Sequence, residues 1–232
     1  CCCYEDVRVF DPVAGGEALL VLDSGDDWVM ALAFFTDPAT GAPRLACGTS
    51  IDGGNSGDVR VFDPVTGGEA VVVIDVGSKV LALAVFADPA TGALRLACGC
   101  SGEARIVDPV AGGEALVVLE GHRTYVEALT VFTDQATGGL RLASGSRDKT
   151  VRIWDLAAGG AALFVLRSGS VCALTAFADP ATGDMRLASG SRKTLRVWDA
   201  SKGGAALQVV PFDDDVNALA VRGDTSGLFV AS

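Results

Sequence analysis

Few residues in this chain have types and spacings that could do chemistry. His122 is the only histidine among 232 residues, and catalysis would require a nucleophile or carboxylate beside it in a cleft. The run Asp213–Asp215 offers carboxylate oxygens of the kind that bind Ca²⁺ or Mg²⁺, but charge runs more often form solvated turns. The seven cysteines show neither zinc-ribbon spacing nor a C-x-x-C redox motif. We therefore expect no catalytic residue, no metal site and no cofactor.

Charge and hydropathy narrow the possible partners. The formal net charge is −11, with only 18 lysines and arginines and no cluster of them along the sequence. Nucleic acid and anionic membrane surfaces require a basic face, so we expect neither as a partner. Half of the residues are apolar, but no apolar run approaches the about 18 residues of a membrane-spanning helix. The free thiols favour the cytoplasm, or alternatively the nucleus, over secretion.

The elements that position these residues repeat along the chain. The string "RLACG" or "RLASG" begins at Arg44, Arg95, Arg141 and Arg186, at spacings of 51, 46 and 45 residues. Each unit contains four strand-like segments: "V-x-A-L", then "RLA-S/C-G", then "VR-V/I-F/W-D", then an apolar burst after "GG". Asp-Pro and Gly in the connections indicate tight turns. Four short antiparallel strands at this period are typical of a β-propeller.

One unit carries a more specific motif. The segment from Gly121 to Asp155, "GHRTYVEALTVFTDQATGGLRLASGSRDKTVRIWD", resembles a WD40 repeat, with GH at its start and WD at its end. The resemblance extends over all five units and implies an all-β, WD40-like β-propeller of four-stranded antiparallel blades. It also implies a hydrogen-bonded tetrad in this unit, formed by His122, Ser144, Asp148 and Trp154.

The other units depart from the tetrad. The unit that follows keeps the Trp and the Ser but has lost the Asp and the His. In the earlier units Cys47 and Cys98 stand where the tetrad Ser would be, and "FDP" or "VDP" replaces the final "WD". We expect these departures to affect rigidity but not the fold, because the packing area supplies most of the stability.

The two ends of the chain align with complementary halves of one repeat. The C-terminal "LFVAS" matches "MRLAS", and the N-terminal "CCCYEDVRVFDP" matches "CGCSGEARIVDP". WD40 rings resemble a clasp of this kind, in which the two termini share a blade. The prediction is a single five-bladed domain over residues 1–232, with residues 1–23 and 212–232 sharing one blade and continuous blades at 24–76, 77–120, 121–167 and 168–211. The alternative, which the absence of an initial Met favours, is a fragment of a longer array.

The repeats differ most just before and within the start of the first strand. By the resemblance, these positions lie on the top face around the central channel, where WD40 domains bind partner peptides. The predicted rim consists of Asp26, Asp27, Trp28, Met30, Lys79, Arg123, Tyr125, Glu127, Ser170, Asp214, Asp215 and Asn217.

The predicted function is a non-catalytic scaffold for protein–protein interaction, serving as one part of a larger chain or complex. Its rim would capture a partner peptide or domain through aromatic and charged anchors. The acidic rim residues leave an alternative open, a glycosidase-like propeller hydrolase with paired carboxylates.

An arginine recurs at the second position of the third segment in every unit. Its regular recurrence indicates a structural role in pairing between blades rather than a one-sided binding site. The members of this set are Arg8, Arg60, Arg105, Arg152 and Arg196.

Overall fold

A computed structural model describes the backbone of residues 3–221 and 228–231, and the side chains of residues 6–25, 27–51 and 53–220. The chain forms two compact units. The first comprises Cys1–Ala87, Ala93–Cys100 and Arg105–Val117, and the second comprises Asp88–Gly92, Ser101–Ala104 and Val118–Ser232. Apart from one 3₁₀ turn at Ile51–Gly53, every described element is a β-strand, as the repeat pattern predicts.

The first unit contains a five-stranded antiparallel sheet in the order β1-β2-β3-β4-β5. These strands are β1 (Cys3–Val9), β2 (Leu20–Thr36), β3 (Pro43–Ser50), β4 (Asp58–Phe62) and β5 (Val72–Asp75). The antiparallel pair β6 (Ala82–Ala87) and β7 (Leu94–Gly99) follows along the chain. The residues of the next strand, β8 (Ser101–Val107), are divided between the two units.

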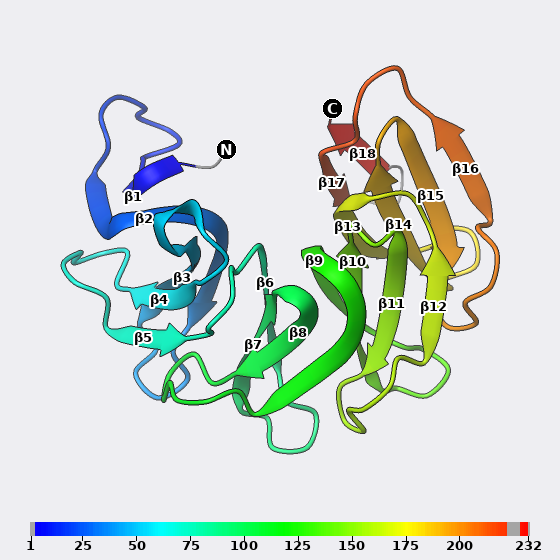
Figure 1. Cartoon of the computed structure of the whole chain (residues 1–232), viewed down its shortest axis with the longest axis horizontal. Coiled ribbons are helices and arrows are strands. Elements are labelled where there is room, and N and C mark those ends of the chain that lie inside the picture. The colour runs from blue at the N-terminus through cyan, green and yellow to red at the C-terminus, as the bar shows by residue number, and fades with distance from the viewer. Residues whose placement is uncertain (1–2, 222–227, 232) are drawn as a thin grey trace. The chain divides into compact units, whose positions relative to one another are not determined.

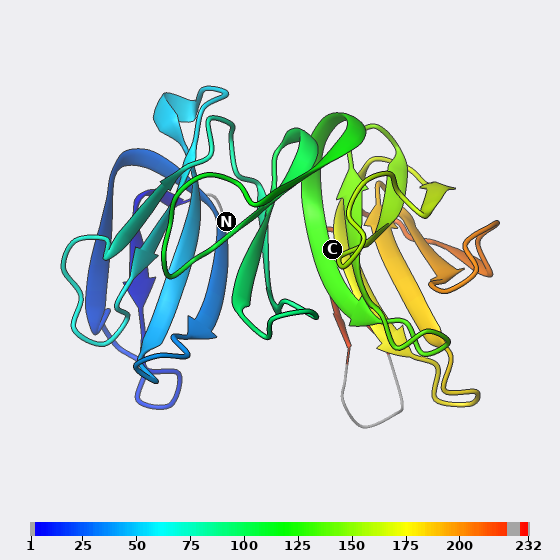
Figure 2. The same ribbon diagram turned by 90° about the horizontal axis from the view of Figure 1, so that it is seen from below.

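The second unit contains two four-stranded antiparallel groups and a final pair. The first group is β9 (Val117–Thr133), β10 (Leu140–Ser146), β11 (Thr150–Asp155) and β12 (Phe164–Arg167). The second is β13 (Val171–Ala178), β14 (Met185–Ser191), β15 (Thr194–Asp199) and β16 (Gln208–Pro211). Figures 1 and 2 show the second group, in yellow to orange, with its strands side by side. The pair β17 (Ala218–Val221) and β18 (Leu228–Ala231) ends the chain.

The fourth strand of one repeat and the first strand of the next are continuous at two places, where the sequence pattern indicates separate segments. β2 and β9 each run for 17 residues through such a connector. The connectors Val76–Lys79 and Ser168–Ser170 are shorter and bend, so β5 and β6, like β12 and β13, remain separate. The strands are therefore continuous at the longer connectors and separate at the shorter ones.

The repeated Asp at the end of each third strand organises the corner that follows. One carboxylate oxygen accepts from the backbone N–H groups two and three residues further along. In four repeats this Asp also pairs with the arginine that opens the second strand, at distances of 2.6–3.5 Å. The pairs are Arg44–Asp63, Arg95–Asp108, Arg141–Asp155 and Arg186–Asp199. The recurrence of "RLA" and of the final Asp thus has a common structural reason.

The core of each unit lies between its sheets. In the second unit, Ile153 and Leu166 of one sheet pack with Leu187 and Trp198 of the next. In the first unit, Val59 and Ile74 pack with Leu96 in the same way. Each large apolar side chain buried in this manner contributes about 1.5–3 kcal/mol. Because a single sheet buries only part of its faces, successive repeats depend on one another for stability.

Close approach of successive sheets explains the Gly of the "RLA-S/C-G" motif. A Cβ on Gly145 would lie 2.4 Å from Val171 Cγ1, and one on Gly190 would lie 2.7 Å from Val216 Cγ1. Gly48 has the same relation to Val80, at 2.5 Å. The valine in each pair opens the first strand of the following repeat. The glycine leaves room for that valine, which is why the two residues recur together.

Candidate partner-binding rim and the histidine tetrad

The four residues of the expected tetrad lie together in the second unit. His122 comes from β9, Ser144 from β10, Trp154 from β11, and Asp148 from the turn between β10 and β11. His122 Nδ1 lies 2.9 Å from Asp148 Oδ2, and His122 Nε2 lies 2.7 Å from Ser144 Oγ. Trp154 Nε1 donates to the same Ser144 Oγ at 2.8 Å. One buried hydroxyl therefore links the imidazole to the indole.

The electrostatics of the tetrad fix its protonation. Burial lowers the pKa of His122, which outweighs the opposite effect of Asp148. A neutral imidazole donates from Nδ1 to Asp148 and accepts at Nε2 from the Ser144 hydroxyl. Burial by itself raises the pKa of Asp148, but hydrogen bonds from Thr150, His122 and the Arg123 N–H outweigh it and lower the pKa to about 2. His122 thus has a structural set of partners, and the Ser144 hydroxyl that it contacts is fully buried and also accepts from Trp154.

The repeats without a complete tetrad differ in how much of it they keep. In the following repeat, Trp198 Nε1 donates to Ser189 Oγ at 3.0 Å, and Ser168 Oγ lies 3.2 Å from the same hydroxyl. In the first unit, Cys47 and Cys98 are fully buried. Burial raises the pKa of Cys47 to about 12 and that of Cys98 well above its usual value. Both thiols are therefore neutral and unreactive.

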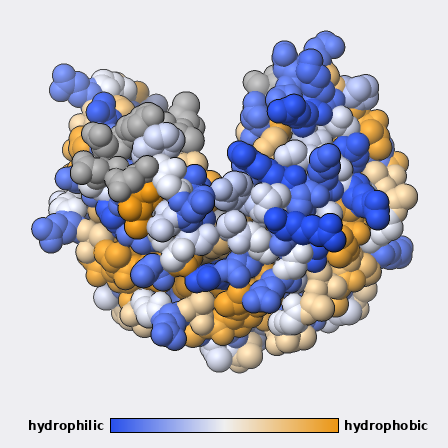
Figure 3. Space-filling view, in the orientation of Figure 1, coloured by the Kyte–Doolittle hydropathy of each residue, from blue (hydrophilic) through white to orange (hydrophobic). Residues whose placement is uncertain are grey.

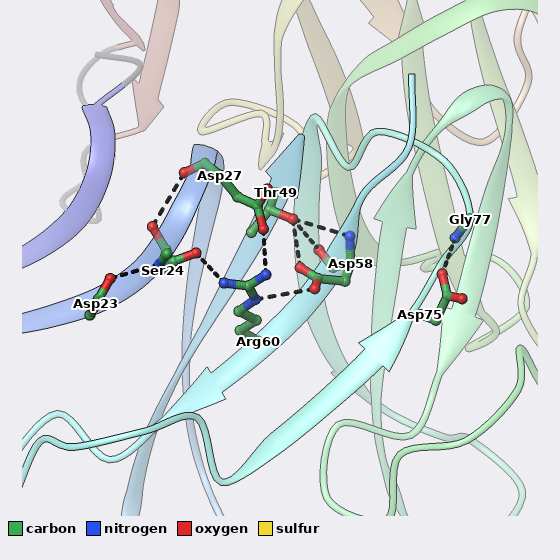
Figure 4. A network of polar contacts seen from close by, with 9 residues as sticks. Asp23, Ser24, Asp27, Thr49, Asp58, Arg60, Asp75 and Gly77 are labelled. Carbon is green, nitrogen blue, oxygen red and sulfur yellow. Dashed lines mark hydrogen bonds and ion pairs between the residues drawn. The ribbon is translucent and has the colours of Figure 1, made fainter. Parts of the chain in front are cut away.

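A different polar network occupies the first unit, and sequence reasoning missed it. Figure 4 shows the guanidinium of Arg60 between Asp27 and Asp58, with a further hydrogen bond to the carbonyl of Ser24. Thr49 Oγ1 donates to Asp58 Oδ1 at 2.6 Å. The network joins β2, β3 and β4, so Arg60 has a structural role in this unit.

A sequence signal for this network exists. Acid and arginine stand two positions apart in Asp58-Val59-Arg60 and again in Asp6-Val7-Arg8, which puts them on the same face of a strand. Arg8 Nη2 indeed lies 3.1 Å from Asp6 Oδ2. The contact with Asp27 carried no such signal, because it joins residues 33 positions apart.

The predicted rim residues of the first unit differ in how far they reach solvent. Asp27 is buried and pairs with Arg60, so its carboxylate is engaged within the unit. Trp28 is half-buried, and its ring lies against Gly53, where a Cβ would approach Trp28 Cζ2 to 3.3 Å. Met30 and Lys79 are also half-buried. The side chain of Asp26 lies outside the described residues.

The predicted rim residues of the second unit include a preorganised cluster. Arg147 Cζ lies 5.6 Å from the ring centroid of Tyr125, and Arg147 Nη2 lies 2.6 Å from Glu127 Oε1. The Arg147 side chain remains 57% exposed. Arg147 is absent from the predicted rim, although it is the partner that holds Tyr125 and Glu127 in place.

The remaining rim positions of this unit lie close in sequence to Cys172 or to its hydrogen-bond partner, Val216. Cys172 Sγ donates to the carbonyl of Val216 at 3.1 Å. Burial raises the pKa of Cys172, and the charges of Glu127 and Asp215 raise it further. Ser170 is half-buried, whereas Asp214, Asp215 and Asn217 are exposed. Figure 3 shows hydrophilic side chains gathered on the displayed face of this unit.

This arrangement offers binding groups rather than reactive ones. Within the described residues, no three His, Cys, Asp or Glu side chains come together as a metal site would require. No helix in the described part of the chain is long and apolar enough to cross a membrane. The rim offers half-buried aromatic rings, the exposed guanidinium of Arg147 and exposed carboxylates, and aromatic and arginine side chains are enriched at protein interfaces.

Comparisons with known proteins agree with the architecture. The family described as "WD domain, G-beta repeat" (WD40) matches residues 113–155, which include the complete tetrad. A chain in the crystal structure of a mitotic checkpoint complex is similar in fold, with a TM-score of 0.74 and 21% sequence identity. That similarity covers 99% of this chain and 67% of the other. No curated protein sequence matches the chain. Residues 113–155 thus match a WD40 repeat, and the fold of the chain is that of a β-propeller.

Proposed function

We propose that this protein is a non-catalytic interaction scaffold that captures a partner peptide or domain on the rim at the start of the first strands. The observation that carries the proposal is the cluster of Tyr125, Arg147 and Glu127. The ion pair and the ring contact hold Arg147 in place while much of it stays exposed. Tyr and Arg are the residue types that most often anchor protein interfaces, and holding them in advance lowers the entropy cost of binding.

The acidic end of the rim suggests what the partner carries. Asp214 and Asp215 are exposed, and neither pairs with a basic group among the described residues. A lysine or arginine of the partner would gain electrostatic attraction there, and the net charge of −11 would speed its approach. The mitotic checkpoint complex that contains the similar fold is itself an assembly of proteins, which fits a protein partner here.

A triple variant tests the rim. Trp28→Ala, Tyr125→Ala and Asp215→Ala together remove two aromatic anchors and one carboxylate. We expect the immobilised variant to lose, by about ten-fold or more, a defined set of proteins that the unmodified chain retains, as quantified by mass spectrometry. The matched control is Phe10→Ala, Phe34→Ala and Glu17→Ala, which likewise removes two aromatic rings and one carboxylate, from exposed positions away from the rim. Equal recovery by both triple variants would contradict the proposal.

A direct activity assay distinguishes the hydrolase alternative from the scaffold. A glycosidase turns over chromogenic glycosides without a partner, whereas a scaffold does not. We expect the unmodified chain to show no turnover above that of a variant with both Asp26→Asn and Asp215→Asn. Turnover that the double substitution abolishes would favour the hydrolase.

A further inference from the structure

Three hollows in the chain surround the repeated arginine of the third strand. Two lie in the first unit, with volumes of about 540 and 440 Å³, around Arg60 and Arg105. The third lies in the second unit, with a volume of about 600 Å³, around Arg152. The same side chain thus stands in three settings, which can be compared directly.

The charge of the surrounding residues is reversed in the third hollow. Acidic side chains accompany the arginine in the first two, namely Asp23 and Glu69 in one and Asp75 and Glu114 in the other. The third is lined by four cations, Arg123, Lys149, Arg152 and Arg167, and by a single carboxylate, Asp148. This basic hollow, called the cationic pocket below, lies in a chain whose net charge is −11.

Strand register shows how the reversal arises. In the first unit, Asp58 of β4 pairs with Asp75 of β5. At the corresponding place in the second unit, Thr150 of β11 pairs with Arg167 of β12. Two carboxylates are therefore replaced by a hydroxyl and a guanidinium.

The cations of the pocket form no ion pairs within the described part of the chain. Nε of Arg152 is buried and has no hydrogen-bond partner in the described part of the chain, whereas Arg60 donates to two carboxylates and a carbonyl. Arg123, Lys149 and Arg167 form no ion pair with any described residue. A partly buried guanidinium without an acidic partner is costly, so the pocket favours an anion that pairs with its charge.

Asp148 lines the pocket but does not pair with the guanidinium of Arg152. Its Oδ2 accepts from His122 Nδ1 and from the Arg123 N–H, at 2.9 and 3.0 Å. Its Oδ1 accepts from the N–H and the hydroxyl of Thr150, at 2.9 and 2.6 Å. These four donors occupy the carboxylate, which leaves the guanidinium of Arg152 for a ligand.

We propose that the cationic pocket binds an oxyanion, carboxylate or phosphoryl, carried by an acidic segment of a partner protein. Planar guanidinium groups bind both kinds of oxyanion in bidentate geometry. The hydroxyl of Ser168 lines the same space and can donate to a remaining oxygen. A long polyanion such as nucleic acid fits poorly, because the overall negative charge repels phosphates beyond the pocket.

The site is separate from the rim of the proposed function. It shares only Arg123 with the rim, and it demands an anion where the rim offers carboxylates to a cation. The rim triple variant keeps every cation of the pocket, so the two proposals can fail independently.

Matched charge changes in neighbouring repeats test the pocket. The test variant is Arg167→Glu with Lys149→Asn, and the control is Arg192→Glu with Lys193→Asn. Both pairs change the charge equally, and both lysines have positive φ, 68° and 50°, which Asn tolerates. Fluorescence anisotropy would follow three labelled peptides, one rich in Asp and Glu, one with a phosphoserine and one with the unmodified serine.

We expect the acidic peptide, the phosphopeptide or both to bind more tightly than the serine peptide. The test variant should weaken that binding about ten-fold, and the control less than about two-fold. Tight binding of only one peptide identifies carboxylate or phosphoryl as the oxyanion. The ring signals of His122, the only histidine, should shift with occupancy because His122 bonds to Asp148 at the pocket.

Three results would overturn the proposal. The first is that neither anionic peptide binds better than the serine peptide. The second is that both variants weaken binding equally, which would indicate overall charge. The third is competition by inorganic phosphate at the same concentration as the phosphopeptide, which would make the ligand a free anion rather than a partner segment.

Discussion

At the scale of single residues, His122 illustrates how environment decides the role of a reactive side chain. Its two nitrogens are used by Asp148 and Ser144, at 2.9 and 2.7 Å. Among the four tetrad residues, the Ser144 hydroxyl is the one group of a nucleophilic type, and it also accepts from Trp154 Nε1. In this protein, residue types that could serve in catalysis instead join strands β9, β10 and β11.

The lowered pKa of His122 predicts how stability depends on pH. As pH falls below about 6.5, the imidazole of the unfolded chain takes up a proton, while the folded ring, whose pKa lies lower, does not. The unfolded state then binds more protons, so the free energy of unfolding decreases as pH falls through this range. Urea unfolding between about pH 7.5 and pH 5 measures the slope, since ordinary carboxyl groups titrate below this window.

His122→Gln provides the comparison for that slope. It removes the only imidazole and keeps an amide that can hydrogen-bond. We expect a lower stability at pH 7.5 and a flatter dependence on pH. A variant with the slope of the unmodified chain, or an unmodified chain that gains stability as pH falls, would contradict the assignment.

At the scale of elements, the contact between successive sheets depends on small residues. Ala143 and Ser144 are fully buried, and Gly145 leaves the space that Val171 fills. Protein interiors have little room for an added methyl group. The packing of β10 against β13 should therefore be sensitive to a single carbon atom.

Gly145→Ala measures this sensitivity. The new Cβ would lie 2.4 Å from Val171 Cγ1, so we expect destabilisation of about 1–3 kcal/mol. Val171→Ala removes the obstructing methyl groups and leaves a cavity, with a cost of similar size. In a double-mutant cycle followed by urea unfolding, the double variant should lose less than the sum of the single losses. Additive losses would show that the two residues do not compete for the same space.

The strands show which features a local sequence pattern predicts and which it does not. Turn residues and apolar alternation located the strands in every repeat, because both signals act over a few residues. The pattern separated the fourth and first strands everywhere, whereas β2 and β9 run through their connectors. Whether a connector pairs depends on contacts with β1 or β10, which lie outside the local pattern.

At the scale of the whole molecule, the expected closed ring requires β18 to pair with β1. Within the first unit, β1 already pairs with β2 on one edge, from Asp6↔Asp23 to Val9↔Leu20. Successive amides of a strand point to opposite edges, so only alternate amides of β1 donate to β2. The other amides are satisfied within a sheet only if a second strand lies alongside.

Amide hydrogen exchange therefore tests closure. If the ends share a blade, as the alignment of the termini predicts, all amides from Asp6 to Val9 exchange slowly and at similar rates. If only β2 pairs with β1, protected and fast-exchanging amides alternate along these four residues. The corresponding residues Thr194–Val197 of β15, which pair on both edges, provide the reference for a fully paired third strand.

The amino-acid sequence by itself determined the repeat, the all-β class and the types of residue in the tetrad. These features depend on spacing along the chain, on turn-forming residues and on apolar periodicity. The sequence also singled out the arginines of the third strand, but it could not distinguish one from another.

Only the tertiary structure decided what each repeated residue does. Arg60 is enclosed by carboxylates from β2 and β4, whereas Arg152 lies among other cations, and its buried Nε has no acceptor among the residues that the structure describes. Asp27, which the sequence placed on the rim, is buried against Arg60. The physical reason is that charge and burial at a point are set by residues tens of positions apart, which only folding brings within a few ångströms.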